Sequence, residues 1–182
     1  MLPLGTEAPD IRLPDASGKV WALEAVTDAP ALLVMFLCNH CPYVRHIRDE
    51  LASATRQFRQ RGVAVVGINS NDIEAYPDDA PERMVEEARA AGYEFPYLVD
   101  ETQVVAAAYR AACTPDFFLF DGDRRLVYRG QFDDSRPAND RPVSGADLRA
   151  AVDAVLAGHP VAGDQRPSMG CSIKWKPGHA PD

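Results

Sequence analysis

The chain has 182 residues, of which 46% are hydrophobic and 25% charged, and its formal net charge is −8. This length suits one ordinary domain that buries its own core without a disulfide scaffold. The acidic excess argues against nucleic acid and anionic membrane surfaces as partners.

The N-terminal stretch and the apolar runs suggest a compartment. The longest apolar run lies between residues 29 and 38 and is too short to cross a bilayer. Residues 1–14 lack the basic and apolar regions of a signal peptide. We therefore expect a cytoplasmic protein with no membrane association, in which four cysteines serve chemistry or packing rather than a static disulfide framework.

Hydrophobic periodicity and turn residues predict strands and helices that alternate along most of the chain. Continuous apolar runs indicate buried strands, and apolar positions three or four residues apart indicate helices. In chain order, we expect a hairpin over 11–22, a strand over 31–37, a helix from 41 or 42 to 62, a strand over 63–68, a helix over 79–91, a strand over 95–99, a helix over 102–112, a hairpin of strands 117–120 and 126–128, and a helix over 144–158.

This order predicts an α/β fold in one domain, with a central sheet covered by helices on both faces. An N-terminal hairpin extension over 1–30 precedes the core over 31–158, and a tail over 159–182 follows it. In the tail, apolar and polar residues alternate, as in an extended segment with one apolar face. We expect this segment to dock on the core through that face, which consists of Cys171, Ile173 and Trp175.

The loop and the helix start that follow strand 63–68 have two interpretations each. Residues 69–78 leave the carboxyl end of a strand, where α/β proteins bind ligands, but we favour a solvated acidic loop. Asp79 precedes Ala-Pro-Glu82, a pattern that predicts an N-cap followed by a proline in the first helical turn.

The motif Cys38-Asn-His-Cys41 lies where a buried strand ends and a helix begins. Unpaired backbone N–H groups at a helix N-terminus stabilise a thiolate there, which lowers a cysteine pKa from its usual value of about 8.5. We expect Cys38, nearer the solvent, to attack a substrate and Cys41, further into the helix, to resolve the mixed disulfide. The chain has no second C-x-x-C motif, which favours redox chemistry over a zinc ribbon.

Motifs spread over nearly the whole chain resemble one known group. They are Glu7-Ala-Pro-Asp-Ile11, Val34-Met-Phe-Leu-Cys38, Gly67-Ile-Asn-Ser-Asn71, Phe95-Pro-Tyr-Leu-Val-Asp100 and Thr114-Pro-Asp-Phe-Phe-Leu-Phe-Asp121. The chain resembles the thioredoxin-like superfamily, in its alkyl hydroperoxide reductase/thiol-specific antioxidant (peroxiredoxin-like) branch. The segments Cys38–Tyr43 and Gly170–Trp175 resemble an uncharacterised bacterial thioredoxin-family subgroup. The resemblance implies a thioredoxin-like fold with a central mixed β-sheet, an N-terminal β-hairpin and a C-terminal extension.

The resemblance also implies roles for single residues. Thioredoxin-like folds place a cis-proline opposite the cysteine pair, and Thr114-Pro115 matches that place, so the backbone of Thr114 would bind substrate. Asn39 and His40 stand where thioredoxin has Gly-Pro, and a histidine before the second cysteine resembles protein disulfide isomerase, so both residues would tune the redox potential. Met35 stands where a peroxidatic signature has threonine, which argues against a peroxidase.

We therefore predict a thiol-disulfide oxidoreductase that acts by dithiol–disulfide exchange through Cys38 and Cys41, without organic cofactor or metal. Its partners would be a protein or small-molecule disulfide and a reducing partner such as a thioredoxin or a low-molecular-weight thiol. Two alternatives stay open: a peroxiredoxin-like thiol peroxidase with Cys38 as the peroxidatic residue, and a metal-binding or metallochaperone protein. Cys113 and Cys171 are candidates for additional redox thiols, and each fits a packing role equally well.

Overall fold

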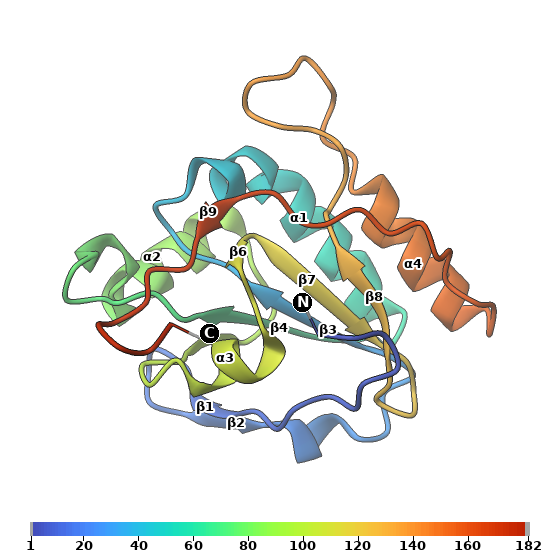
Figure 1. Ribbon diagram of the computed structural model, residues 1–182, viewed down its shortest axis with the longest axis horizontal. Coiled ribbons are helices and arrows are strands. Elements are labelled where there is room, and N and C mark those ends of the chain that lie inside the picture. The colour runs from blue at the N-terminus through green and yellow to red at the C-terminus, as the bar shows by residue number, and fades with distance from the viewer. Residues whose placement is uncertain (1, 181–182) are drawn as a thin grey trace.

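The computed structural model describes residues 2–180 of the chain. Its elements follow one another as strands and helices in alternation (Figure 1). They are β1 (Arg12–Pro14), β2 (Val20–Ala22), the 3₁₀ helix Leu23–Val26, β3 (Leu32–Phe36), α1 (Pro42–Gln60), β4 (Ala64–Asn69), the 3₁₀ helix Pro77–Asp79, α2 (Pro81–Ala91), β5 (Tyr97–Val99), α3 (Val104–Tyr109), β6 (Cys113–Thr114), β7 (Asp116–Phe120), β8 (Leu126–Gly130), α4 (Ala146–Leu156) and β9 (Cys171–Ser172).

Five strands form the central sheet, in the order β5-β4-β3-β7-β8. β3 and β4 are parallel, as are β4 and β5, whereas β7 runs antiparallel to both β3 and β8. Parallel neighbours need a crossover connection, and α1 and α2 supply it between β3 and β4 and between β4 and β5. The sheet is therefore mixed, which confirms the α/β fold expected from the sequence.

The sheet separates two apolar layers, as Figure 1 shows with α1 and α4 on one side and α3 and the β1–β2 hairpin on the other. β3 is buried along its whole length, and its side chains alternate between the layers. Leu33 and Met35 pack with α1, α2 and α4, whereas Val34 and Phe36 pack with α3 and the hairpin. The continuous apolar run in the sequence thus reflects burial on both faces.

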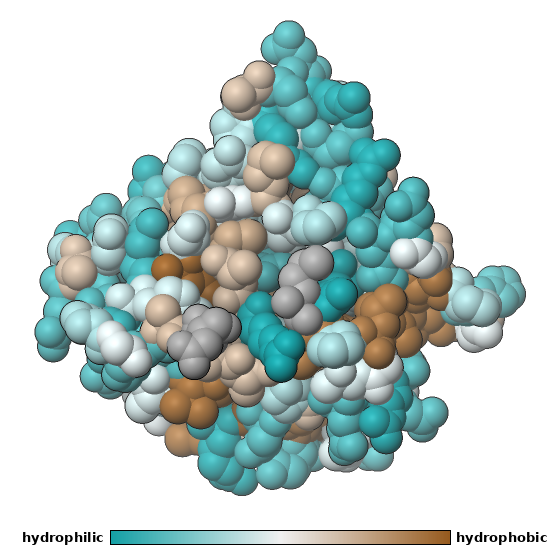
Figure 2. All heavy atoms as spheres, viewed as in Figure 1, coloured by the Kyte–Doolittle hydropathy of each residue, from teal (hydrophilic) through white to brown (hydrophobic). Residues whose placement is uncertain are grey.

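The face of the molecule seen in Figure 2 is largely polar. In the view of Figure 2, hydrophilic residues dominate and hydrophobic ones gather in separate small groups. None of the helices in residues 2–180 is both long and apolar enough to span a membrane.

The helix expected over 102–112 is the clearest difference from the sequence prediction. α3 covers only Val104–Tyr109, because Gln103 and Arg110 on either side adopt left-handed backbone conformations, with φ of 62° and 50°. A left-handed residue interrupts the helical hydrogen-bond ladder, so it marks a boundary that the apolar periodicity does not reveal. The shortened helix leaves Cys113 and Thr114 free to form β6.

The C-terminal tail docks on the body as an extended segment, as expected. β9 pairs antiparallel with β6, so that Ser172 lies opposite Cys113 and Cys171 opposite Thr114 (Figure 1). Ile173 is buried in the layer of α3, and Cys171 and Trp175 are half-buried. The alternating pattern therefore marks a real apolar face, which covers one end of the central sheet.

Candidate active site

Cys38 and Cys41 lie at the junction between β3 and α1. Cys38 follows the end of the buried strand, and Cys41 is the N-cap of α1, with extended backbone angles of −69° and 124°. Pro42 occupies the first helical position, where a missing N–H costs nothing and a fixed φ favours the helix. The proline thus makes the helix begin after Cys41 rather than after Cys38.

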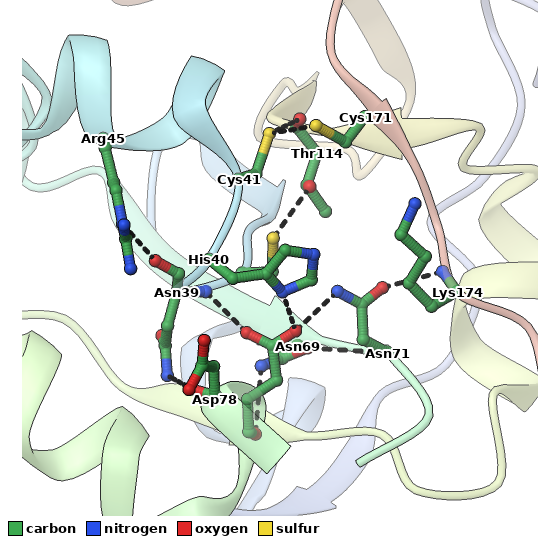
Figure 3. A network of polar contacts seen from close by, with 12 residues as sticks. Asn39, His40, Cys41, Arg45, Asn69, Asn71, Asp78, Thr114, Cys171 and Lys174 are labelled. Carbon is green, nitrogen blue, oxygen red and sulfur yellow. Dashed lines mark hydrogen bonds and ion pairs between the residues drawn. The ribbon is translucent and has the colours of Figure 1, made fainter. Parts of the chain in front are cut away.

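The residue pair Thr114-Pro115 lies opposite these cysteines, and its peptide bond is cis, as expected. The hydroxyl of Thr114 lies 3.1 Å from the Cys38 Sγ atom, and its carbonyl oxygen lies 3.2 Å from the Cys41 Sγ atom. A third sulfur, that of Cys171 on β9, is 2.9 Å from the Cys41 Sγ atom. Figure 3 shows Cys41, Thr114 and Cys171 pointing toward one another from three separate segments.

The two cysteines of the motif have opposite pKa shifts. A hydrogen bond from the Cys38 thiol lowers the pKa of Cys41 to about 4, with further help from the Cys171 thiol and from the backbone N–H of Val44 on the first turn of α1. The same bond to Cys41, then burial and the negative charge of Asp79, raise the pKa of Cys38 far above its usual value. The helix end and the neighbouring thiols thus favour ionisation of Cys41, whereas burial and Asp79 disfavour it at Cys38.

The sequence analysis expected Cys38 to attack first, whereas these pKa directions favour Cys41. The physical reason is the position of the helix start, because the unpaired N–H groups of α1 surround its N-cap residue. Cys38, three residues earlier, faces Asp79 instead of the helix end. The predicted strand and helix located the motif in the sequence, but they did not show which of its two cysteines lies at the first turn of the helix.

Cys113 points elsewhere, although it precedes Thr114. Its thiol donates to the carbonyl oxygen of Pro115 at 3.6 Å, and burial raises its pKa to about 12. Successive residues of a strand face opposite sides, so the position of Thr114 beside the cysteine pair turns Cys113 away from it. Of the two additional thiols, the structure brings Cys171 to the pair.

A buried carboxylate, Asp79, organises the loop between the two cysteines. One of its oxygens accepts the backbone N–H of Asn39 at 2.7 Å. The other lies 2.7 Å from the His40 Nδ1 atom and accepts the side-chain amide of Asn71 at 2.8 Å. The expectation that Asp79 caps α2 is wrong, since the N-cap is Ala80 and the carboxylate turns inward. The sequence around Asp79, with a proline two residues later, is typical of an N-cap. It therefore gave no indication that Asp79 accepts hydrogen bonds from the cysteine loop.

Asn39 and His40, expected to tune the pair, are both held in place. The Asn39 side chain donates to the carbonyl of Asp78 at 2.9 Å and accepts the hydroxyl of Tyr97 at 3.1 Å. The ring of His40 stacks on Tyr76, with the ring centroids 5.3 Å apart. The segment between the cysteines is therefore fixed by groups from two other parts of the chain, residues 76–78 and β5.

The interpretation of residues 69–78 as a solvated loop is wrong for its first half. Asn69, Ser70 and Asn71 are buried. Asn71 accepts the backbone N–H of Lys174 at 2.8 Å, while Gln103 donates to the carbonyl of Lys174 at 2.9 Å and to that of Ser70 at 2.7 Å. Figure 3 shows this side of the network, which connects the loop beneath the cysteines to the tail above them.

Three potential metal ligands also meet here. The Cys38 Sγ atom, a ring nitrogen of His40 and a carboxylate oxygen of Asp79 all lie within 4.8 Å of one another. Both Asp79 oxygens already accept hydrogen bonds, from the Asn39 backbone and the Asn71 amide. A metal ion would have to displace these donors, so the same residues serve better as a hydrogen-bonded support for the cysteine loop.

Comparison with known proteins identifies the family. Residues 4–129 match the model described as the AhpC/TSA family. The protein belongs to the AhpC/TSA family. The crystal structure of a hypothetical protein from Sinorhizobium meliloti 1021 is similar over 98% of this chain and 97% of that chain, at 56% identity and a TM-score of 0.96. An uncharacterised conserved protein from Geobacillus kaustophilus is 55% identical, covers 97% of this chain and 94% of its own, and has a TM-score of 0.94.

More distant matches define the fold of this AhpC/TSA protein. The thioredoxin domain of a thiol-disulfide oxidoreductase from Bacteroides vulgatus has a TM-score of 0.59 at 20% identity, over 71% of this chain and 89% of that chain, which shows that the fold is thioredoxin-like. A curated relative, 1-Cys peroxiredoxin B of Oryza sativa subsp. indica, is 30% identical over 77 residues. That match spans 42% of this chain and about a third of the rice protein, 35% of its length. The chain is therefore an AhpC/TSA family member with a thioredoxin-like fold.

Proposed function

We propose that the protein is a thiol-disulfide oxidoreductase that acts by dithiol–disulfide exchange through Cys38 and Cys41. The observation that carries the proposal is the position of the pair, with Cys41 as the N-cap of α1 and both sulfurs against Thr114. The neighbouring thiols and the backbone N–H of Val44 lower the pKa of Cys41 and so favour its thiolate. A thiolate is the form of cysteine that attacks disulfides. Cys38 lies within hydrogen-bonding reach of it and supplies the second thiol of the reaction.

The exchange proceeds in two steps. The Cys41 thiolate attacks one sulfur of a disulfide, so that a mixed disulfide forms on Cys41 and the other sulfur leaves as a thiolate. Cys38 then attacks the Cys41 sulfur, the Cys38–Cys41 disulfide forms, and the reduced substrate leaves. A thioredoxin or a low-molecular-weight thiol, as reducing partner, returns the pair to the dithiol.

The order of events follows from the charges in the site. In the dithiol form, the hydrogen bond to the Cys41 thiolate keeps Cys38 protonated. Once Cys41 has entered the mixed disulfide, its negative charge is gone and so is the main cause of the raised Cys38 pKa. The hydroxyl of Thr114 lowers the pKa of Cys38 and supports its ionisation at that stage. Cys38 therefore becomes the attacking residue of the second step.

Single-cysteine variants test this proposal with oxidised glutathione as the disulfide. Wild type should release two glutathione thiols per chain and form the Cys38–Cys41 bond, identified by mass spectrometry of peptides. Cys38→Ser should stop before the Cys38–Cys41 bond forms, while Cys41→Ser should not release a second glutathione thiol. Cys113→Ser is the matched control, because its thiol faces away from the pair. Release of two glutathione thiols per chain by Cys41→Ser at the wild-type rate would contradict the proposal.

The family membership favours a second candidate, a thiol peroxidase. The sequence analysis named Cys38 as the peroxidatic residue. The lowered pKa of Cys41 and the raised pKa of Cys38 favour Cys41 as the residue oxidised first. Cys41 would be oxidised by a hydroperoxide to a sulfenic acid, and Cys38 would condense with it to a disulfide and water. The rate of oxidation of the reduced protein by hydrogen peroxide distinguishes the two functions. A rate no faster than that of free cysteine overturns the peroxidase.

A further inference from the structure

β9 covers the cysteine pair, and several contacts hold it there. Beyond its pairing with β6, the tail is fixed through Lys174, whose backbone bonds to Asn71, Gln103 and Asp72. Gly170 packs flat on Thr114, and a Cβ atom at this position would lie 2.6 Å from the carbonyl carbon of Thr114, closer than real side chains approach. These contacts fix the tail against β6 in one register, with Cys171 opposite Thr114.

The exposures of the three sulfurs differ in a way that matters for access. Cys41 is fully buried and Cys38 is 1% exposed, whereas Cys171 is partly exposed. The residue that covers the thiolate is therefore itself a thiol, 2.9 Å away, and it is the part of the site that solvent reaches. A disulfide in solution meets Cys171 before it meets Cys41.

The geometry points to Cys171 as a third catalytic thiol, which receives the substrate and passes it to Cys41 as a disulfide. This inference rests on the proposed function and supplies the route by which substrate reaches its buried nucleophile. The expected pairing of Thr114 with a substrate backbone is replaced by its pairing with Cys171 of the same chain. The tail therefore occupies the position that the family resemblance assigns to the substrate.

The relay conserves atoms and electrons over three exchanges. First, Cys171 passes its proton to Cys41, whose sulfur is 2.9 Å away, and attacks the substrate disulfide as a thiolate. A mixed disulfide forms on Cys171, and the departing substrate sulfur takes the proton from Cys41. Second, the Cys41 thiolate attacks the Cys171 sulfur, the Cys41–Cys171 bond forms, and the second substrate sulfur leaves as a thiolate. Third, Cys38 attacks Cys41, the Cys38–Cys41 bond forms, and the proton of Cys38 passes to Cys171. The substrate gains two electrons, and Cys171 ends as it began.

Disulfide mapping after reaction with oxidised glutathione tests the relay. Cys38→Ser removes the third exchange, so the Cys41–Cys171 bond should accumulate in this variant. Adding Gly170→Ala forces β9 away from Thr114 and should slow formation of that bond by about tenfold or more. Adding Gly163→Ala is the matched control in the same tail, since a Cβ atom there meets nothing within 4 Å.

Cys171→Ser separates the relay from the proposed function. If the relay is correct, this variant should form the Cys38–Cys41 bond with glutathione about tenfold more slowly than wild type, or slower still. Formation of that bond at the wild-type rate overturns the relay and leaves the oxidoreductase proposal intact. Absence of a Cys41–Cys171 bond in Cys38→Ser also overturns it. Failure of wild type to form a Cys38–Cys41 bond would instead refute the proposed function.

Discussion

Replacing Asp79 tests whether a buried carboxylate supports the segment between the two cysteines. This side chain is fully buried and binds the backbone N–H of Asn39, the ring of His40 and the amide of Asn71. Asp79→Ala leaves at least the Asn39 and Asn71 donors without their acceptor. Each unpaired buried group costs about 1–3 kcal/mol, so the loss of two partners should lower the free energy of unfolding by about 2–6 kcal/mol.

Asp79→Asn distinguishes the hydrogen-bonding role of Asp79 from the effect of its negative charge. The amide oxygen can still accept the N–H of Asn39, so the free energy of unfolding should fall by only about 1–2 kcal/mol. The negative charge of Asp79 is one cause of the raised Cys38 pKa, so its removal should also lower that pKa. Titration of thiolate absorbance near 240 nm would follow Cys38 in a background in which Cys41, Cys113 and Cys171 are all replaced by serine.

Urea unfolding of the reduced protein at neutral pH measures the stability effect. Asp78→Ala is the matched control. The Asp78 side chain is exposed, and only its backbone carbonyl binds Asn39, so the substitution leaves the hydrogen bonds of Asp79 intact. The reasoning is refuted if Asp79→Ala unfolds within about 0.5 kcal/mol of Asp78→Ala, the range typical of surface substitutions. It is also refuted if Asp79→Asn raises the Cys38 pKa.

Three further outcomes follow from burial and pKa shifts, each measured by urea unfolding of the reduced protein. The pKa of Cys41 falls from about 8.5 in an unfolded chain to about 4, so its stabilisation is complete above the unfolded value and is lost as the pH drops toward 4. The stability advantage of wild type over Cys41→Ser should therefore shrink between about pH 8 and pH 5, and an advantage independent of pH would contradict this. Burial raises the pKa of Asp116 to about 6, the opposite shift, so its contribution is complete below about pH 4 and is lost as the pH rises through 6. Asp116→Asn should gain about 2–3 kcal/mol relative to wild type between pH 4 and pH 7, and an equal difference at both values would argue against it. Ile173→Ala should lower the free energy of unfolding by about 2 kcal/mol or more, because the side chain is 4% exposed, whereas the exposed control Val85→Ala should change it by less than about 0.5 kcal/mol.

The sequence by itself determined the frame of the site. The apolar run before Cys38 predicted a strand, because a strand buried on both faces is apolar at every position. The apolar residues three or four positions apart after Cys41 predicted a helix, because a helix buries only one side. The motif was therefore expected between the two elements. Alternation around Ile173 predicted a docked tail for the same reason. The cis peptide bond before Pro115 was predicted from the family resemblance, because the local sequence does not distinguish a cis from a trans proline.

Tertiary structure decided which groups complete that frame. Asp79 comes from a segment 40 positions away from Asn39 along the chain, and Cys171 lies 130 positions from Cys41. Such pairings depend on how the sheet and the tail fold back on the motif, and no periodicity within either segment records them. The directions of the two pKa shifts depend likewise on groups from separate segments, namely the end of α1, the buried Asp79 and the sulfur of Cys171.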